Sequence, residues 1–459
     1  MIKIHLKDDA YESDVRAMVQ AFYPNVLLFV EKDETVLEKQ RIKTDEPIEF
    51  TLDVDTEVND KNELKRRLYS DLSIRTGKTL PWGTLTGIRP TKIPMKLLHE
   101  GYSDPDIMEE LKREYLVSHD KAQLSLNVAK EESGILSKVP SGSYSLYIHI
   151  PFCPTRCAYC SFTSFPADKY EGVMNEYVDA LMSELKAIAK SLGLKKPSTI
   201  YMGGGTPTAL PCTELTRLCN CIKELFYNES LLEWTVEAGR PDSIDEEKLR
   251  TLLNAGVTRI SINPQTMNQA TLDIIGRHHS VDDIYKTFKL ARQVGFNNIN
   301  ADLIMGLPSE GVREVEHTLK CIKALEPESL TVHSLARKHN ADMTVNADMY
   351  IDYMLSDTEK LMDMAKHTAD ELNLKPYYLY RQKMMSGNQE NIGYAKPGKE
   401  GYYNILIMEE YHSIISAGAG AITKIVDTPG HLKKRIENVK DVREYIKRID
   451  EMIERKAEI

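Results

Sequence analysis

The sequence predicts an α/β protein built around a sheet of parallel strands, because a strand followed by a helix recurs six times in mid-chain. Each strand is a short apolar run that ends in glycine, proline or a polar residue. The six runs, between residues 145 and 334, are SLYIHI, STIYMGG, EWTVEA, TRISIN, NINADLIMG and SLTVHS. Parallel neighbours need right-handed helical crossovers. Such a sheet is either an open doubly wound layer or a barrel, complete or partial.

The first 140 residues are expected to form a separate α+β domain of unknown role. MIKIHLK and NVLLFVEK predict strands, and YESDVRAMVQAFY and KNELKRRLYSDLSIRTGK predict helices. The Pro- and Gly-containing segment LPWGTLTGIRPTKIPMKLL then interrupts this pattern. The linker Ser137–Ser143 combines Pro, Gly and Ser, so we place a boundary there and begin the central domain, residues 144–335, after it.

Residues 336–459 predict a second, smaller α+β domain that serves as a substrate or lid domain. Their strand–helix rhythm is looser, and one stretch is rich in Tyr, Gly and Lys. The run KDVREYIKRIDEMIERKAE predicts a single charged terminal helix.

Composition indicates a globular protein of two or three domains, with 459 residues, 42% hydrophobic residues and a net charge of -10. That charge argues against a nucleic-acid partner. No apolar run approaches the roughly 18 to 20 residues of a membrane span. The first residues lack a secretory signal, and the seven cysteines are not spread in pairs. We therefore expect a reducing cytoplasm.

Cys153, Cys157 and Cys160 follow the spacing C-x3-C-x2-C directly after the first central strand. Thiolates this close in sequence can converge on one polynuclear centre. Iron–sulfur cubanes normally take four cysteines, so three leave one iron with an open position, as catalytic zinc sites also do. The spacing favours a cubane; the alternatives are a zinc site completed by a histidine such as His149, or buried structural thiols.

The ends of the next strands also carry residues suited to a ligand. Three consecutive glycines, 203–205, let the backbone approach a ligand closely, and no phosphate-loop motif accompanies them. Glu237, Gln265 and Asp302 end the third, fourth and fifth strands, and Arg277 lies between the last two. Each alone is more often a cap or an ion-pair partner. Together they are expected to ring one mouth of the sheet.

The cysteine spacing after a first β-strand resembles that of the radical S-adenosylmethionine (SAM) superfamily. The resemblance implies a partial (β/α)6 barrel and a 4Fe–4S cluster held by the three cysteines. It also implies that SAM chelates the open iron through its amino and carboxylate groups. One electron, from an external donor of the flavodoxin or ferredoxin type, then yields a 5′-deoxyadenosyl radical.

The motifs GGGTPT, VEAGRPD, INPQT, GRHH and DLIMGLP resemble the oxygen-independent coproporphyrinogen III dehydrogenase family within that superfamily. WGTLTGIRPTK, PYYLYRQK and GYAKPGKEGYYNILIMEE are similar to its HemZ branch, so the resemblance covers essentially the whole chain. Decarboxylating members hold two SAM molecules, so one or two are expected here. The implied cofactor-binding residues are Tyr147, Gly204 and Glu237 for the molecule on the cluster, and Tyr159, Gly205, Thr206, Gln265, Arg277 and Asp302 for a second molecule.

The resemblance implies a tetrapyrrole ligand, either a porphyrinogen or haem. Decarboxylating relatives convert two propionates of coproporphyrinogen III into vinyl groups, giving protoporphyrinogen IX. Guanidinium and ammonium groups bind such carboxylates. The candidates are Arg240, Arg381, Lys383 and Lys396, with Tyr377, Tyr378 and Tyr380 packing either on the macrocycle or within their own domain.

Phe162 is the point at which the sequence departs from the decarboxylating relatives. Those relatives carry a further cysteine two residues after the last cluster ligand, where this chain has Phe162. The phenylalanine form resembles haem-binding relatives, which bind haem and pass it to acceptor proteins. The sequence therefore predicts a coproporphyrinogen III dehydrogenase, with a haem-trafficking protein or a radical haem-modifying enzyme as the alternatives.

Overall fold

The computed structural model of the chain describes residues 1–7, 11–23, 26–32, 49–55, 60–87, 89–336, 341–346, 358–382, 389–457 and 459. These residues belong to two compact units. The first comprises Met1–Lys130 with Leu379–Glu390, and the second comprises Glu131–Tyr378 with Asn391–Ile459.

The first unit contains a three-stranded parallel sheet in the order β2-β1-β3. Alternate residues of its strands are buried with one face of the first two helices, as the period-two and helical patterns predict. Its strands are β1 (Ile2–Leu6), β2 (Leu28–Lys32) and β3 (Phe50–Val54). Its helices are α1 (Glu12–Phe22), α2 (Lys61–Thr76), α3 (Lys92–His99) and α4 (Asp104–Tyr115), and α5 (His119–Leu136) begins in it. The strands and helices predicted here are confirmed.

Residues 379–390 belong to this unit although they are distant in sequence. The Trp82 indole N–H donates to Glu390 at 2.8 Å, and Lys121 pairs with the other oxygen of Glu390 at 2.7 Å. The Arg381 guanidinium lies over the Trp82 ring, 5.8 Å from its centroid. The Pro- and Gly-containing segment of the sequence thus supplies an anchor for a later part of the chain.

The second unit is built on an 11-stranded sheet in the order β12-β13-β11-β10-β9-β8-β7-β4-β14-β15-β16. All six predicted central strands are present, parallel and adjacent in chain order. They are β4 (Tyr144–Ile150), β7 (Pro197–Gly204), β8 (Glu233–Glu237), β9 (Arg259–Ser261), β10 (Ile299–Met305) and β11 (Ser329–Ser334).

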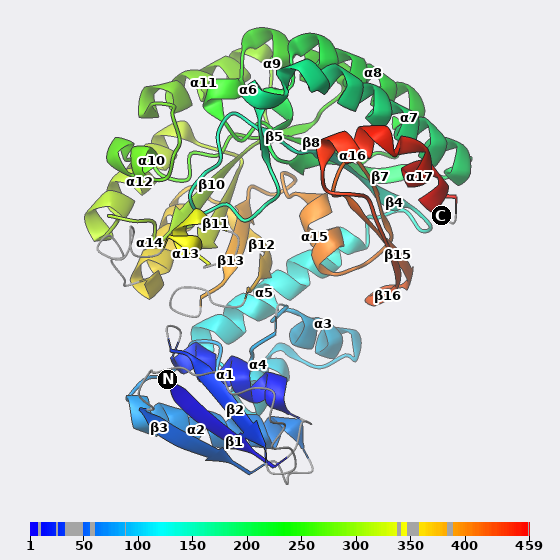
Figure 1. Cartoon of the computed structure of the whole chain (residues 1–459). Helices are drawn as coiled ribbons and strands as arrows, with labels where there is room; N and C mark the ends of the chain where they lie inside the picture. The colour runs from blue at the N-terminus through cyan, green and yellow to red at the C-terminus, as the bar shows by residue number, and fades with distance from the viewer. Residues whose placement is uncertain are drawn as a thin grey trace. The chain divides into compact units, whose positions relative to one another are not determined.

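The crossover helices line the outer side of this curved sheet (Figure 1). They are α7 (Met174–Leu192), α8 (Cys212–Phe226), α9 (Glu246–Ala255), α10 (Gln269–Ile274), α11 (Val281–Val294) and α12 (Val312–Leu325). The sheet does not close on itself, because β12 and β16 are its two ends. The predicted α/β class with a partial (β/α)6 barrel is therefore confirmed.

The C-terminal part of the chain extends both sides of the same sheet. β13 pairs antiparallel with β11, and β14 pairs parallel with β4. The elements are α13 (Asp342–Val345), α14 (Thr358–Glu371), β12 (Lys375–Tyr380), β13 (Asn391–Ala395), α15 (Tyr402–Met408), β14 (Ile414–Ala417), β15 (Ile422–Thr428) and β16 (His431–Glu437). The second unit thus continues past residue 335, where we expected a domain boundary. A substrate or lid role for residues 336–459 stays a prediction.

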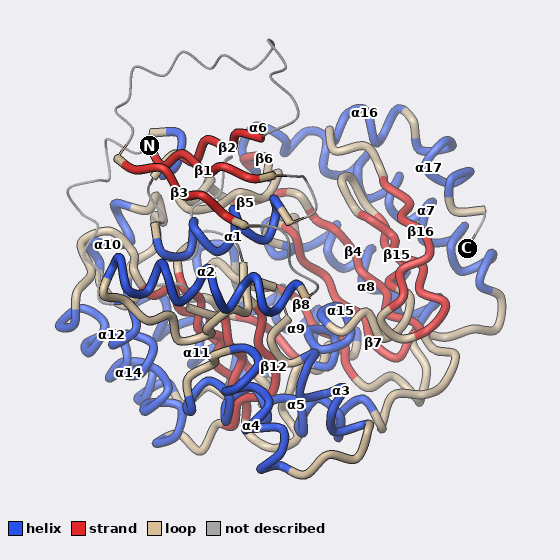
Figure 2. Tube along the Cα trace, turned by 90° about the horizontal axis from the view of Figure 1, so that it is seen from below, coloured by secondary structure: helices blue, strands red, loops and turns tan. Residues whose placement is uncertain are grey.

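The predicted single terminal helix is wrong: the chain forms α16 (Val442–Lys447) and α17 (Ile449–Arg455) with a break at Arg448. Tyr445 of α16 and Lys456, the residue after α17, both contact Glu184 of α7. Tyr445 donates to Glu184 at 2.6 Å, and the Lys456 ammonium lies 3.9 Å from the same carboxylate. Figures 1 and 2 both place α16 and α17 beside α7.

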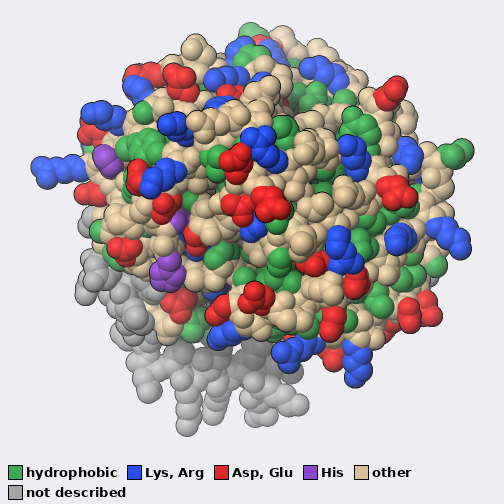
Figure 3. All heavy atoms as spheres, turned by 90° about the horizontal axis from the view of Figure 1, so that it is seen from above, with side chains coloured by type: hydrophobic (Ala, Val, Ile, Leu, Met, Phe, Trp, Pro, Cys, Tyr) green, Lys and Arg blue, Asp and Glu red, His purple; other side chains and the backbone are tan. Residues whose placement is uncertain are grey.

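No helix in the described ranges is both long and apolar enough to cross a membrane. On the face seen in Figure 3, basic and acidic side chains are interspersed.

Candidate functional site

The three-cysteine loop leaves the carboxyl end of β4 and is closed at its base. β5 (Phe152–Cys153) pairs with β6 (Phe165–Pro166), and the Phe165 N–H donates to the Pro151 carbonyl at 2.8 Å. Within the loop, the Cys160 N–H donates to the Cys157 carbonyl at 3.0 Å, which makes a tight turn. All three cysteines are partly exposed. The fold thus brings the three thiols together on one short, pinned loop.

The glycine run after β7 lies directly against this loop. The Gly205 N–H donates to the Ile150 carbonyl and the Thr206 N–H to the Phe152 carbonyl, both at 2.7 Å. Gly204 has φ +102, and a Cβ there would lie 2.4 Å from the His149 ring. Both the backbone conformation and the contact therefore require glycine. The Thr206 hydroxyl also donates to the Cys153 sulfur at 3.6 Å.

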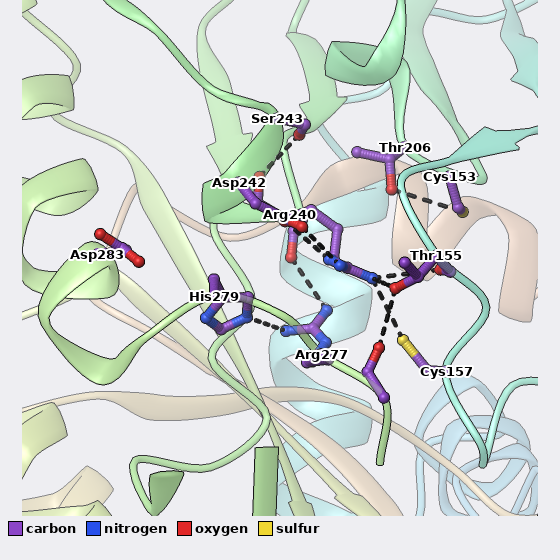
Figure 4. A network of polar contacts seen from close by, with 12 residues as sticks. Cys153, Thr155, Cys157, Thr206, Arg240, Asp242, Ser243, Arg277, His279 and Asp283 are labelled. Atoms are coloured by element: carbon purple, nitrogen blue, oxygen red, sulfur yellow. Dashed lines mark hydrogen bonds and ion pairs between the residues drawn. The ribbon is translucent and has the colours of Figure 1, made fainter. Parts of the chain in front are cut away.

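Arg240 follows β8 and contacts the cysteine loop (Figure 4). Its Nη1 donates to the Thr155 carbonyl at 3.2 Å, to the Thr155 hydroxyl at 3.0 Å and to the Cys157 sulfur at 3.7 Å. Its Nε and Nη2 donate to the Asp242 carboxylate at 2.9 and 2.7 Å. The side chain is only 3% exposed. Asp242 already supplies Arg240 with a carboxylate, and a contact between Arg240 and a substrate carboxylate stays a prediction.

Arg277 approaches the same cysteine from the segment after β9. It donates to the carbonyls of Asn263 and, at 3.1 Å, of Gly239. Burial opposes ionisation of the Cys157 thiol, but Arg277 and Arg240 outweigh it and lower the pKa of Cys157. Burial raises the pKa of Tyr159, which also lies near Arg277 and Cys157. Cysteine binds a metal as the thiolate, and the two guanidinium groups favour the thiolate of Cys157, so Cys157 is suited to be a ligand.

Cys153 lies in a different electrostatic environment on the same loop. Burial raises its pKa to about 11, although the Thr206 hydrogen bond and Arg240 act in the opposite direction. The Cys157 and Cys160 charges act in the same direction as burial and raise the pKa of Cys153 further.

The buried carboxyl groups of Glu237 and Asp302 interact electrostatically within the barrel. The Tyr201 hydroxyl donates to the Glu237 carboxylate at 2.5 Å. Burial raises the pKa of Glu237 to about 7; the Tyr201 hydrogen bond lowers it and Asp302 raises it. Asp302 is also buried, but hydrogen bonds from His333 and Asn300 outweigh burial and lower its pKa. The two carboxylates therefore differ in charge near neutral pH. Glu237 ends β8, whereas Asp302, expected at the end of its strand, lies in the middle of β10.

Three tyrosines stack beside Glu237, and two of them were missed by sequence reasoning. Tyr403 of α15 packs on Tyr201 with ring centroids 4.4 Å apart, and Tyr147 lies 6.1 Å from Tyr403 and 6.2 Å from Tyr201. The Tyr147 hydroxyl hydrogen-bonds to Nδ1 of His149 at 3.0 Å. His149 thus packs against Tyr147 and Gly204, whereas we had considered it as a zinc ligand. The segment GYYNI contains Tyr403, but its spacing gave no sign that it folds back to this edge.

Gln265 is held in a left-handed conformation, with φ +67. Its backbone bridges β10, accepting from the Ile304 N–H at 3.1 Å and donating to the Asp302 carbonyl at 2.9 Å. The side chain is 7% exposed, and its Oε1 accepts no hydrogen bond from the described residues. A buried amide oxygen without a donor is rare in folded proteins and fits a position that contacts a ligand.

These residues fit the expected cluster and nucleoside cofactor. Three thiols lie on one loop, the glycine backbone beside them carries no Cβ, and a carboxylate and an orphaned amide oxygen lie at the same edge. Among the described residues, no three His, Cys, Asp or Glu side chains are grouped to hold a single metal ion.

Of the other basic residues expected at the substrate, Lys396 lies away from this edge and Arg381 belongs to the first unit. Arg381 is 4% exposed and packs on Trp82 in the first unit. Lys396 lies 3.7 Å from Glu328 at the amino end of β11, whereas the cysteine loop follows the carboxyl end of a strand. Lys383 lies outside the described residues.

The tyrosines considered for the macrocycle pack within the protein. Tyr377 and Tyr378 are 1% and 5% exposed, so both are core residues. The Tyr377 hydroxyl accepts from Asn404 at 3.2 Å, and the partly buried Tyr380 belongs to the first unit. The alternative we left open, packing within the protein, is the one that the structure shows for Tyr377 and Tyr378.

Residues 147–322 match the model of the radical SAM superfamily. The chain is 41% identical over 404 residues to the oxygen-independent coproporphyrinogen-III oxidase-like protein HemZ of Bacillus subtilis, covering 86% of this chain and 80% of that protein. It is 38% identical over 192 residues to the heme chaperone HemW of the same organism, covering 42% of this chain and 50% of that protein.

The fold is similar to that of coproporphyrinogen III oxidase (HemN) from Escherichia coli. The TM-score is 0.54 at 23% identity, over 70% of this chain and 72% of that structure. The chain therefore belongs to the radical SAM superfamily, whose members use a 4Fe–4S cluster and SAM, and within it to the oxygen-independent coproporphyrinogen-III oxidase-like proteins.

Proposed function

We propose that the chain is a radical SAM oxidoreductase that decarboxylates coproporphyrinogen III to protoporphyrinogen IX without oxygen. The observation that carries the proposal is the three-thiol loop pinned against the glycine run at the carboxyl edge of a partial barrel. The family relationship to the oxidase-like HemZ supports a tetrapyrrole as the ligand.

The cluster and SAM, when bound, supply a carbon-centred radical that removes a hydrogen atom from the substrate. Cys153, Cys157 and Cys160 are the residues that would hold the cluster. A Cβ at any of residues 203–205 would lie within 3 Å of Glu237, the His149 ring or the Phe152 carbonyl, so only glycines fit beside the cysteine loop. Glu237, with a pKa raised to about 7 by burial, can accept a hydrogen bond from an amino or hydroxyl group of the cofactor when ionised.

The proposed reaction balances for each propionate. One hydrogen atom leaves the carbon next to the ring, carbon dioxide leaves from the carboxylate, and one electron passes to an external one-electron acceptor, which leaves a vinyl group. The electron that starts each cycle comes from an external donor of the flavodoxin or ferredoxin type. Buried side chains around the loop exclude water, which protects a radical from side reactions.

A second candidate function, haem binding and transfer, is favoured by Phe162. Its side chain is 59% exposed on the cysteine loop, where an aromatic ring can pack against a flat macrocycle. The similarity to the heme chaperone HemW over 192 residues points in the same direction. A radical SAM enzyme that modifies haem is a further alternative that also involves haem binding.

Product analysis under strict anaerobiosis tests the proposal. The reconstituted protein is mixed with a reductant, SAM and coproporphyrinogen III, and the products are followed by mass spectrometry. We expect vinyl products, methionine and 5′-deoxyadenosine to accumulate together. Methionine and 5′-deoxyadenosine without vinyl products would contradict decarboxylation. Stoichiometric haem uptake with transfer to an acceptor protein, weakened by Phe162→Ala, would then support the second candidate.

Iron analysis tests the ligand assignment separately. Alanine variants of Cys153, Cys157 and Cys160 should each lose cubane iron after reconstitution. Cys321→Ala is the matched control, because Cys321 is buried on α12 outside the loop and should leave the iron content unchanged. A full complement of cubane iron in any of the three loop variants would show that the assignment is wrong.

A further inference from the structure

The buried Arg240 and the partly exposed Asp242 form an ion pair beside the cysteine loop. The Arg240 side chain is 3% exposed and that of Asp242 is 23% exposed, and Nη2 lies 2.7 Å from the carboxylate. A buried guanidinium interacts more strongly with neighbouring charges than an exposed one, because solvent and salt screen it less.

The pair has a fixed orientation toward the loop. Nε and Nη2 point to Asp242, whereas Nη1 points to Thr155 and to the Cys157 sulfur, 3.7 Å away (Figure 4). The positive end of the pair therefore faces a cluster-ligand sulfur, and the negative end faces away from it. Because both the bidentate contact and the Thr155 contacts hold the guanidinium, this polarity does not depend on a flexible side chain.

We propose that the Arg240–Asp242 pair sets the reduction potential of the cluster. Reduction adds one negative charge to the cluster, so an N–H donor and a positive charge at a ligand sulfur stabilise the reduced form more than the oxidised form. Arg240 is thus a positioning residue that raises the potential, and Asp242 limits how far it is raised. This inference rests on the cluster of the proposed function and not on the tetrapyrrole reaction.

The cysteine loop is also anchored to the segment around Gly276. The Thr155 hydroxyl donates to the Gly276 carbonyl at 2.9 Å, and the Ala158 N–H donates to the Ile275 carbonyl at 3.0 Å. Thr155→Val removes the hydroxyl from both Gly276 and Arg240, but Arg240 keeps its contacts with Asp242, the Thr155 carbonyl and the Cys157 sulfur. This variant therefore separates loop position from electrostatics.

Anaerobic redox titration of the reconstituted full chain tests the inference, with the reduced cluster followed by electron paramagnetic resonance. At the wild-type midpoint, Arg240→Gln should lower the ratio of reduced to oxidised cluster at least tenfold, which equals about 59 mV for a one-electron couple. Asp242→Asn should shift the midpoint in the opposite direction, because the Arg240 charge is then uncompensated. The Thr155→Val control should stay at the wild-type midpoint.

An unchanged midpoint in Arg240→Gln, or shifts of the two variants in the same direction, would overturn the inference. So would a Thr155→Val shift equal to that of Arg240→Gln, since loop position would then explain the effect. If Arg240→Gln binds no iron, the Asp242→Asn variant tests the inference by itself: a raised midpoint supports it, and a lowered or unchanged midpoint overturns it. No substrate is added in this titration, so failure to form vinyl products leaves its result unaffected.

Discussion

Glu237→Gln should stabilise the cofactor-free protein at alkaline pH, because the wild-type carboxyl group is buried at a cost to the fold. Burial raises the pKa of Glu237 from 4.5 to about 7. Below pH 4.5 the carboxyl group is protonated in both the folded and the unfolded protein. Between pH 4.5 and about 7 the unfolded protein releases the proton while the folded protein keeps it. The free energy of unfolding therefore falls as the pH rises through this range.

The size of the effect follows from the two pKa values. Each pH unit in the window corresponds to about 1.4 kcal/mol. Between pH 5 and pH 8 the wild-type free energy of unfolding should fall by about 2.5 kcal/mol relative to that of Glu237→Gln. The amide can still accept the hydrogen bond from Tyr201, so packing at the site is conserved.

Urea unfolding followed by tryptophan fluorescence measures this difference. The chain has two tryptophans, and Trp234 lies fully buried on β8, the strand that ends in Glu237. A Trp82→Phe background in both proteins makes Trp234 the reporter of the barrel unit. Other titrating groups cancel in the difference between the two proteins. A gap that is independent of pH, or that widens toward acid, would refute the reasoning.

Three other substitutions test the site and its support. Gly204→Ala should weaken SAM binding measured by calorimetry at least tenfold, because the new Cβ would lie 2.4 Å from the His149 ring at a positive φ; unchanged binding would contradict the assigned contact. Lys396→Ala should leave the substrate KM unchanged, since Lys396 lies at the amino end of β11, and a large rise in KM would contradict this placement. Glu184→Ala should destabilise the protein by about 3 to 5 kcal/mol in urea unfolding, because it leaves the buried Lys456 ammonium without a carboxylate and the Tyr445 and Asn438 donors without an acceptor. Adding Lys456→Met should recover the part due to the ion pair, and no recovery would show that the ion pair contributes nothing.

The sequence predicted those parts of the site that depend on local spacing. Apolar runs of period two and helical runs between them give the six parallel strands, and parallel strands carry their carboxyl ends to one edge. Cys157 and Gly204 follow such ends, so their meeting at one edge could be foreseen. The position of Glu237 follows from the same rule, but that of Asp302 does not, because it lies in the middle of β10.

Residues that return to the site from distant segments could not be foreseen in this way. Tyr403 stacks on Tyr201 because α15 folds back beside β7, and nothing in its own spacing encodes that direction. Lys396 was expected at the substrate, but β13 runs antiparallel to β11 and carries it to the opposite edge.

Taken alone, the sequence determined the six strands of the central sheet, the edge at which the cysteines gather and the chemistry of their thiols, because these depend on short-range periodicity and on residue type. Only the tertiary structure shows what Arg240 contacts. Its charge and position in VEAGRPD also suit a substrate carboxylate, and the fold places Asp242 on one side of the guanidinium and the Cys157 sulfur on the other. A side chain's direction depends on contacts between segments far apart in the chain, and no spacing within one segment records them.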